Sequence, residues 1–355
     1  MAPSIAPSKV YCTSMDGSQK VAADMAAGSP DGPAEPVLER LGLTIPLPPS
    51  LPDHQGLFRR LADAGYTDVW TTEAAGTDAF TPLALAAAWE PRLRLGTGIA
   101  SVFTRGPALL AQSAAALAEA APGRVMIGVG TSSAVFVRNW NSIDPAKPYR
   151  RAAETLQVLR PALRGERVDL AGETMTVRGL RLDRPPATPP LLVLAALRRG
   201  MIRLAARAAD GIMINWLSAD DVRTVTAEYA DAGGSGPVID RIMVCPNPDA
   251  DVVREAVRPL IARYLSVPGY AEFQRWLGRG EALADMWKAW EAGDRAAAAA
   301  AVPDSVIDEL VVHGTPEQCR RGLAAFAAAG VTVPVVAVMP YGIDPVQGAL
   351  AIAEG

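Results

Sequence analysis

Residues 93–127 read LRLGTGIASVFTRGPALLAQSAAALAEAAPGRVMI, and this stretch predicts the fold of the chain. A short apolar run enters a glycine-rich turn, an alanine-rich helix opens at Pro107, and a Gly123-Arg124 step leads into a second apolar run. Neither run alternates polar with apolar residues, which is typical of parallel strands buried on both faces. We interpret the stretch as a strand-helix-strand unit of a parallel sheet, and we expect the functional chemistry where its first strand stops.

Short apolar runs alternate with helical patterns about eight times from Leu41 onward. The predicted strands cover residues 41–46, 68–73, 93–100, 124–130, 191–197, 210–217, 241–246 and 333–340. The predicted helices cover residues 52–64, 81–90, 107–121, 149–163, 200–209, 218–232, 251–265 and 315–329. Thr81 is the expected N-cap of the second helix, and residues 168–182 are expected to form a small hairpin.

Such an alternation fits either a closed (β/α)8 TIM barrel or an open doubly wound sheet. Eight units in one run without a linker favour the barrel, an α/β fold of a single domain over residues 39–355. Helical insertions are expected at about 135–188 and 267–309. Residues 1–38, rich in Ser, Pro, Ala and Gly, are expected to be a disordered tail, for which a misassigned start codon is an alternative explanation.

Composition excludes several classes of function. The 355 residues are 50% hydrophobic, and the net charge of −4 offers no basic face to nucleic acid. No apolar run approaches the roughly 20 residues that span a bilayer, and the start lacks a secretory signal. Three widely separated cysteines are expected to be free thiols in a reducing cytoplasm. A small-molecule substrate is therefore the expected partner.

Motifs for familiar active sites are absent from the sequence. The two histidines, His54 and His313, are expected to be structural and to lie at the face of the barrel opposite the active site, so no metal site is predicted. Gly128-Val129-Gly130 begins like a dinucleotide fingerprint, but the third glycine is missing. A Rossmann-type site is accordingly not favoured.

Small residues are instead found at the ends of several predicted strands. They leave room for a large, flat ligand bound by backbone groups, although tight loops alone explain the pattern equally well. The segments are Thr72-Glu73-Ala74, Gly98-Ile99-Ala100-Ser101, Gly130-Thr131-Ser132-Ser133, Ala195-Ala196 and Asn215-Trp216.

A possible anion site follows the predicted strand over 191–197. There Arg198 and Arg199 precede Gly200 and Met201 at the start of a helix, where free N–H groups and the helix dipole favour negative charge. Surface arginines without a ligand are an equally good interpretation. Taken with the small strand ends, the pattern describes a pocket for a flat ring with a phosphorylated tail.

Several of these segments resemble the bacterial luciferase-like superfamily, specifically its branch that uses the deazaflavin coenzyme F420. The resemblance spans residues 41–340 and implies an eight-stranded α/β barrel with an insertion. It is carried by LRLGTGIASVF, PALLAQSAAALAEAAPGRVMIGVGTSS, DVWTTE, FTPLALAAA, LLVLAALRRGMIRLAARAADGIMINWLSADDV and VVHGTPEQCRRGLAAFAAAGVTVPVVAVMP.

The resemblance also implies roles for individual residues. Gly98-Ile99 falls where the family has a non-proline cis peptide, a bulge against the back of the deazaflavin ring. Ser101 falls on a ring contact, and Glu73 on the acidic residue at the ring's polar edge. Ala195-Ala196 and Gly200 fall on the loop that binds the tail, and Asn215 on a tail contact.

Two departures from the family pattern limit the substrate class. Several relatives have a histidine after the acidic residue and a glutamate at the end of the fourth strand, whereas Ala74 and Ser133 stand here. A sugar-phosphate substrate is therefore not expected. Glu73 becomes the leading ionisable group near the ring, more as a cofactor anchor than as an acid or base, with Asp78 and solvent as other proton sources.

Three hypotheses follow from the sequence. The first is an F420-dependent oxidoreductase that transfers a hydride between the deazaflavin and a C=C, C=N or C=O group of a small organic substrate. The second is an FMN-dependent monooxygenase that uses reduced flavin and oxygen, and the third is a non-catalytic cofactor-binding member. The resemblance implies a homodimer. Candidates for the substrate side, with core packing as the alternative for each, are Phe103, Phe136, Trp140 and Trp216.

Overall fold

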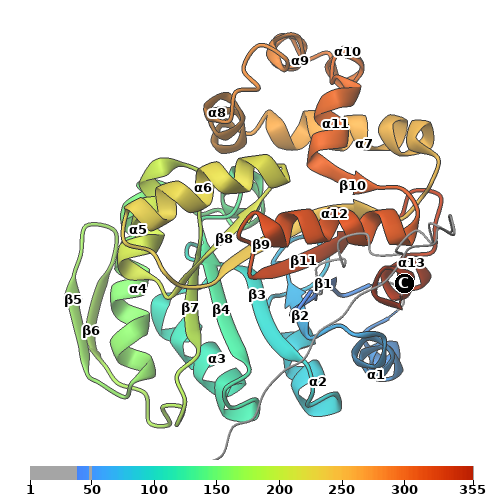
Figure 1. The fold of residues 1–355 in the computed structure, drawn as a ribbon. Helices are drawn as coiled ribbons and strands as arrows, with labels where there is room; N and C mark the ends of the chain where they lie inside the picture. Colours follow the sequence, from blue (N-terminus) through green and yellow to red (C-terminus); the bar gives the residue numbers. More distant parts are fainter. Residues whose placement is uncertain (1–37, 48–49, 355) are drawn as a thin grey trace, which may run out of the picture. The chain divides into compact units, whose positions relative to one another are not determined.

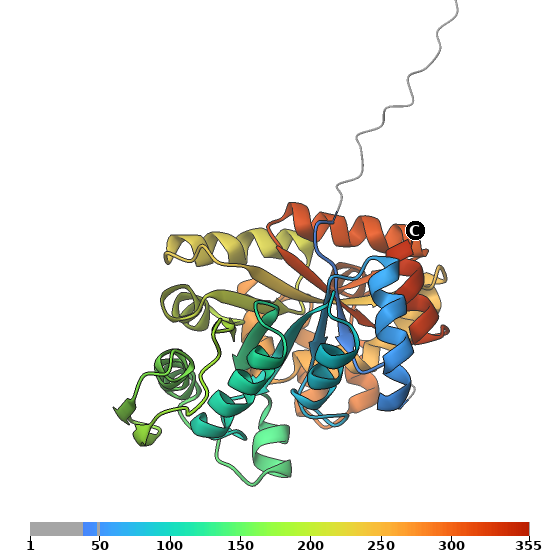
Figure 2. The ribbon, with the colours of Figure 1, turned by 90° about the horizontal axis from the view of Figure 1, so that it is seen from below.

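Eight parallel strands lie side by side and close on themselves (Figures 1 and 2). Their order is β9-β11-β1-β2-β3-β4-β7-β8, and β8 pairs again with β9 to complete the ring. This confirms the predicted closed barrel and excludes the open sheet. The strands are β1 (Gly42–Ile45), β2 (Asp68–Thr71), β3 (Arg94–Ser101), β4 (Val125–Gly130), β7 (Leu191–Ala195), β8 (Gly211–Asn215), β9 (Val238–Cys245) and β11 (Val333–Val338).

The structure is a computed structural model that describes residues 38–47 and 50–354. Apart from Leu38, the predicted tail lies outside the described residues. The described residues belong to one compact unit. Within the described part of the chain, no helix combines the length and the apolar character needed to cross a membrane.

Large side chains fill the interior of the barrel, as in other barrels of this type. Trp70, on β2, is 1% exposed and belongs to this interior cluster. A Cβ atom on Gly96, in the adjacent strand β3, would lie 2.3 Å from the Trp70 ring. The indole therefore requires glycine at this position. The other buried members of the cluster are Met126, Val193, Met213, Ile239, Val333 and Val335.

Helices cover the outside of the barrel, as Figure 2 shows. Each buries an apolar face against the strands, and several begin at a proline, as expected for a first helical position. The capping boxes of Ser218 with Asp221 and of Thr315 with Gln318 are both formed. The covering helices are α1 (His54–Ala64, after the 3-10 turn Leu51–Asp53), α2 (Thr81–Trp89), α3 (Pro107–Ala120), α4 (Pro148–Leu163), α5 (Arg199–Ala208), α6 (Ala219–Asp231), α7 (Ala250–Leu265), α12 (Pro316–Ala328) and α13 (Pro345–Glu354).

Two segments extend beyond the repeating units. The antiparallel hairpin of β5 (Val168–Ala171) and β6 (Thr176–Leu180) confirms the hairpin predicted over 168–182. A helical segment follows α7 and stacks on that side of the barrel (Figure 1). It consists of α8 (Pro268–Trp276), α9 (Ala284–Glu291), α10 (Arg295–Ala300) and α11 (Asp304–Leu310).

Three elements were not predicted. Strand β10 (Val311–His313) pairs with the last residues of β9, beyond the point where β8 stops pairing. A π-helical turn (Val135–Trp140) follows β4, and α13 follows the last barrel strand. Each is short or lies after the last repeat, so the regular strand-helix alternation gave no signal for it.

Candidate active site at the carboxyl ends of the strands

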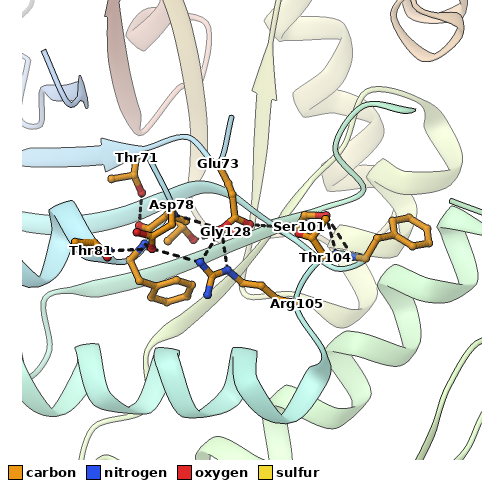
Figure 3. Close-up of polar contacts among 12 residues, drawn as sticks. Thr71, Glu73, Asp78, Thr81, Ser101, Thr104, Arg105 and Gly128 are labelled. Carbon is orange, nitrogen blue, oxygen red and sulfur yellow. Dashed lines mark hydrogen bonds and ion pairs between the residues drawn. The ribbon is translucent and has the colours of Figure 1, made fainter. Parts of the chain in front are cut away.

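Glu73 follows β2 at the carboxyl ends of the barrel strands, which we call the mouth. Its side chain is 7% exposed. Its Oε2 accepts a hydrogen bond from the backbone N–H of Ser101 at 3.1 Å, and its Oε1 accepts one from Arg105 Nε at 2.8 Å (Figure 3). The backbone N–H of Ala79 contacts Oε1 at 3.4 Å. Both carboxylate oxygens are thus engaged, and Glu73 joins the ends of β2 and β3.

Arg105 is the counter-ion that sequence reasoning missed. Its Nη2 lies 2.7 Å from Glu73 Oε1 and 3.3 Å from Asp78 Oδ1 (Figure 3). The guanidinium also stacks on the Phe80 ring, 4.8 Å from its centroid. A largely buried carboxylate requires a cation nearby. Because Arg105 follows the end of β3, the sequence already offered it as a candidate for the counter-ion of Glu73.

Asp78 closes the N-terminus of α2, where Thr81 had been the predicted N-cap. The Asp78 Oδ1 accepts hydrogen bonds from the backbone N–H groups of Phe80 and Thr81 at 2.8 and 3.0 Å. That prediction was wrong because Thr81 is the first helical residue and makes no side-chain cap. Burial alone would raise the pKa of Asp78, but hydrogen bonds from Thr81 and Phe80 and the charge of Arg105 lower it overall. Asp78 therefore stays ionised at neutral pH.

The bulge predicted at Gly98-Ile99 is present, and its peptide bond is cis. The register between β3 and β4 shifts between Thr97 and Ala100, so β3 carries one extra residue at this point. The Thr97 hydroxyl donates to the Gly128 carbonyl at 2.8 Å across the two strands. The bulge thus lies at the mouth, between the ends of β2 and β4.

Small residues surround the bulge. A Cβ atom on Gly130 would lie 3.0 Å from Ile99 Cγ1 and 3.1 Å from Ala195 Cβ, so the ends of β3, β4 and β7 meet there. Thr131 follows Gly130 and is half-buried. Ser101 is fully buried, and its hydroxyl accepts from the N–H groups that follow it, so this side chain closes the turn after β3.

The N-terminus of α5 has the features of an anion site. Arg198 is its N-cap residue, no side chain caps the helix, and no acidic residue lies in its first turn. Gly200 is exposed, and a Cβ atom placed on it would meet nothing within 4 Å. Arg199, in contrast, pairs with Glu228 at 3.4 Å and lies over the Trp276 ring. The predicted Met201 is half-buried in the first turn, and Ala195 and Ala196 precede the helix.

Asn215 ends β8 and contacts the helical segment that follows α7. Its Nδ2 lies 3.2 Å from the Tyr270 hydroxyl of α8. The next residue, Trp216, has a positive φ of 59°, and its carbonyl accepts a hydrogen bond from Gln274 at 2.6 Å. Helix α8 therefore fixes the chain as it leaves β8, a contact that the sequence did not reveal.

The four substrate-side candidates separate into two groups. Phe103 is 7% exposed and Trp216 is 2% exposed, and both pack in hydrophobic clusters. Phe136 and Trp140 lie on the π-helical turn with their rings 5.9 Å apart, and Trp140 is 57% exposed. The structure therefore exposes Trp140 beyond β4, leaves Phe136 half-buried beside it, and places Phe103 and Trp216 in the core.

The two histidines follow the carboxyl ends of strands, so the expectation that they lie at the opposite face was wrong. His54 begins α1 after β1, and His313 ends β10. His54 accepts from the Leu47 N–H at 3.1 Å and contacts the Ser50 carbonyl, while His313 pairs with Asp308. Their contacts are those of structural residues. Within residues 38–47 and 50–354, no group of His, Cys, Asp or Glu side chains is arranged to hold a metal ion.

Comparisons with known proteins agree with this geometry. A protein of Mycobacterium tuberculosis, provisionally named a coenzyme F420-dependent oxidoreductase, is 28% identical over 80% of this chain and 90% of its own. The 5,10-methylenetetrahydromethanopterin reductase of Archaeoglobus fulgidus is 27% identical over 79% of this chain and 88% of its own.

A solved structure and a family model complete the comparison. The coenzyme F420-dependent tetrahydromethanopterin reductase of Methanopyrus kandleri superposes with a TM-score of 0.74 at 20% identity, over 89% of this chain and 97% of the other, which is a likeness of fold. The model of the luciferase-like monooxygenase family matches residues 26–333. The chain therefore belongs to the luciferase-like monooxygenase family.

Proposed function

We propose that the protein is a coenzyme F420-dependent oxidoreductase that transfers a hydride between the deazaflavin and a C=C, C=N or C=O group of a small organic substrate. The bulge at Gly98-Ile99 carries this proposal, because it lies at the mouth between the ion pair of Glu73 and the uncapped N-terminus of α5. Relatives that match most of the chain bear the names of an F420-dependent enzyme and of a reductase.

The residues around the bulge suit a flat ring. Gly130 lies close to the side chains of Ile99 and Ala195, because a Cβ atom on it would lie 3.0 Å from Ile99 Cγ1 and 3.1 Å from Ala195 Cβ. Gly98 and Ile99 are half-buried, so part of their backbone faces the mouth. A surface of this kind supports an aromatic ring through dispersion contacts and backbone groups.

The N-terminus of α5 suits the phosphorylated tail of the coenzyme. Free N–H groups and the helix dipole favour an anion there, and Arg198 adds a charge that pairs with no carboxylate of the described residues. Asn215, at the end of the neighbouring strand β8, offers an amide on the same side of the mouth.

When bound, the coenzyme supplies or accepts the hydride, while the chain orients the reactants and limits the access of water. Glu73 acts in this proposal as an anchor, because Ser101 and Arg105 already occupy its oxygens. Asp78 is ionised at neutral pH and is held by the N-terminus of α2, so it serves as an acceptor. The proton for the substrate then comes from solvent or from a hydroxyl group at the mouth.

Titration of the purified protein with F420 and with FMN tests the proposal. We expect F420 to bind. Gly200→Asp should weaken that binding by about tenfold, because the new carboxylate would place a negative charge beside the phosphorylated tail. Gly200→Ala is the matched control, since the site leaves room for a Cβ atom. Binding of FMN with none of F420 would overturn the proposal.

A reduced-flavin monooxygenase is the second candidate, because the matching family model is described as a luciferase-like monooxygenase. The same titration distinguishes the two cofactors.

A non-catalytic, cofactor-binding member is the third candidate. It is suggested by Ala74 and Ser133, which stand where several relatives carry ionisable residues. Turnover of any member of a panel of enones and imines with reduced F420 would reject it.

We extend the proposal to a homodimer that works in the cytoplasm. The family resemblance and the free, buried thiols of Cys245 and Cys319 support it. Light scattering on the full chain measures the oligomeric state directly, and a monomer at micromolar concentration would contradict it.

A further inference from the structure

Arg241 places a cation inside the barrel mouth. It lies on β9, two residues after Ile239 of the interior cluster, so its side chain points to the same inner face. Its Nε donates to the Thr44 hydroxyl of β1 at 3.3 Å, although β11 stands between these two strands. The guanidinium therefore reaches across the lumen.

This cation has no carboxylate partner among the described residues. Its other contact is with the sulfur of Met243 at 3.7 Å, so most of its five N–H donors are unused by neighbouring protein groups. By comparison, the buried Arg279 has Asp221 and Glu309 within 2.7 Å. Burial lowers the pKa of Arg241, yet arginine stays charged in proteins. Arg241 is half-buried, and a charge partly removed from water without a partner is costly, so an anionic ligand would compensate it.

A cavity adjoins Arg241. It measures about 270 Å³ and is lined by hydroxyl and apolar residues from the ends of β1, β2, β9 and β11. The threonines are Thr44, Thr72 and Thr77, and the buried Thr77 hydroxyl has no partner. Among the described lining residues, Arg241 alone carries a charge. Because whole-ligand pockets start at about 300 Å³, the cavity suits one end of a ligand.

The cavity borders the proposed coenzyme site and extends away from it, because Thr72 precedes Glu73 and Arg241 pairs with Asn215 between β9 and β8. The bulge, Thr131, Ala195 and the N-terminus of α5 belong to the arc of the mouth from β3 to β8. The cavity belongs to the opposite arc, from β9 through β11 to β2. A group bound at Arg241 therefore lies beside the proposed coenzyme, where a substrate has to be held for hydride transfer.

Resting on the proposed function, we infer that Arg241 binds a carboxylate of the substrate, so that the compound reduced or oxidised is an organic acid. A planar guanidinium matches a carboxylate through two parallel hydrogen bonds. A single lining charge matches a monoanion better than a phosphate, which carries close to two charges at neutral pH. The hydroxyls of Thr44 and Thr77 are suited to donate further hydrogen bonds to the same carboxylate oxygens.

Binding of acids and their amides tests the inference without turnover. Propionate, crotonate and benzoate, with the corresponding amides, are titrated calorimetrically into the protein, with and without F420. We expect the best acid to bind at least tenfold more tightly than its amide. Arg241→Met should abolish that preference. Arg223 is an exposed arginine on α6, so Arg223→Met removes the same charge, and this variant should keep the preference for the acid. Thermal unfolding of both variants checks that they are folded.

Three binding results with acids, amides and phosphate would overturn the inference. They are equal binding of acid and amide, an unchanged preference in Arg241→Met, and binding of inorganic phosphate as tight as that of the best acid. A loss of F420 affinity in Arg241→Met would assign Arg241 to the coenzyme and would also overturn it. If F420 fails to bind the unaltered protein while the acid preference persists, the proposed coenzyme fails and the carboxylate site stands. Should Arg241→Met not fold, Arg241→Lys replaces it, with a partial loss of the preference expected because lysine lacks the planar fork.

Discussion

The carboxylate of Glu73 accepts a hydrogen bond from the backbone of Ser101 at 3.1 Å, and this contact joins the ends of β2 and β3 beside the bulge. Arg105 completes the arrangement by pairing with the other carboxylate oxygen (Figure 3). The site is therefore held by an ion pair whose partners are 32 residues apart in the sequence.

The Glu73–Arg105 pair should show energetic coupling. Removal of one partner leaves a largely buried charge, so Glu73→Gln and Arg105→Met should each cost about 3 kcal/mol of unfolding free energy. The double variant should lose less than the sum, by about 1–3 kcal/mol. Urea unfolding of the four proteins measures this. Additive losses would show that the two side chains contribute independently.

Gly96→Ala should destabilise the barrel. The new methyl group would lie 2.3 Å from the fully buried Trp70 ring, and overpacking of this kind costs about 1–3 kcal/mol. Gly56→Ala is the matched control with the opposite sign, because Gly56 is exposed in α1 with nothing nearby. At this position alanine is the better helix former, so Gly56→Ala should raise the free energy of unfolding by about 0.5–1 kcal/mol. If thermal unfolding shows both substitutions to be stabilising, the interior packing described for Trp70 is incorrect.

Glu154 should make stability depend on pH. Burial raises its pKa, but hydrogen bonds from Thr174 and Glu173 outweigh burial and lower it overall. Because the folded pKa lies below the unfolded value of about 4.3, the stabilisation is present above that pH and is lost as pH falls through the folded pKa. The stability difference between wild type and Glu154→Gln should therefore shrink in acid. Glu166 is exposed, so the free energy of unfolding of Glu166→Gln should stay within about 0.5 kcal/mol of the wild-type value at each pH.

Arg279 should hold the segment α8–α11 against the barrel. It bonds Gln274 at 3.1 Å and Asp221 at 2.6 Å, and Gln274 in turn bonds the carbonyl that follows β8. Arg279→Met should speed amide hydrogen exchange in α8 and α9 at least tenfold while α1–α3 remain unchanged. Lys288→Met removes an exposed charge from the same segment and should have no such effect. Uniform exchange changes in both variants would rule out a local clamp.

Hydrophobic patterning predicted the barrel because it repeats in every unit. Strands such as β4 are buried at all six positions, and an uninterrupted apolar run predicts this directly. Strand β10 has three residues and depends on the exposed edge of β9, so its own sequence carries little signal. The N-cap of α2 is Phe80, one residue before the predicted Thr81, and the side chain that bonds the first N–H groups is that of Asp78.

The candidate site was predictable only where local sequence determines it. The bulge was expected from the family resemblance of one glycine-containing run, and the proposed anion site lies within the first turn of α5. Arg241 was missed because its role depends on which strands become neighbours when the barrel closes, whereas Arg105 was missed although it follows β3, the neighbour of the strand that precedes Glu73. Arg241 meets Thr44 across a sequence separation of 197 residues, a contact that no local pattern encodes.

The segment α8–α11 leaves after α7 and returns through β10, which joins the edge of β9. It meets the mouth through Tyr270 and Gln274 at the end of β8, while none of its residues belongs to the bulge. Evolution can therefore exchange this segment as a unit. A relative with a different segment at this place would keep the bulge between β3 and β4 unchanged.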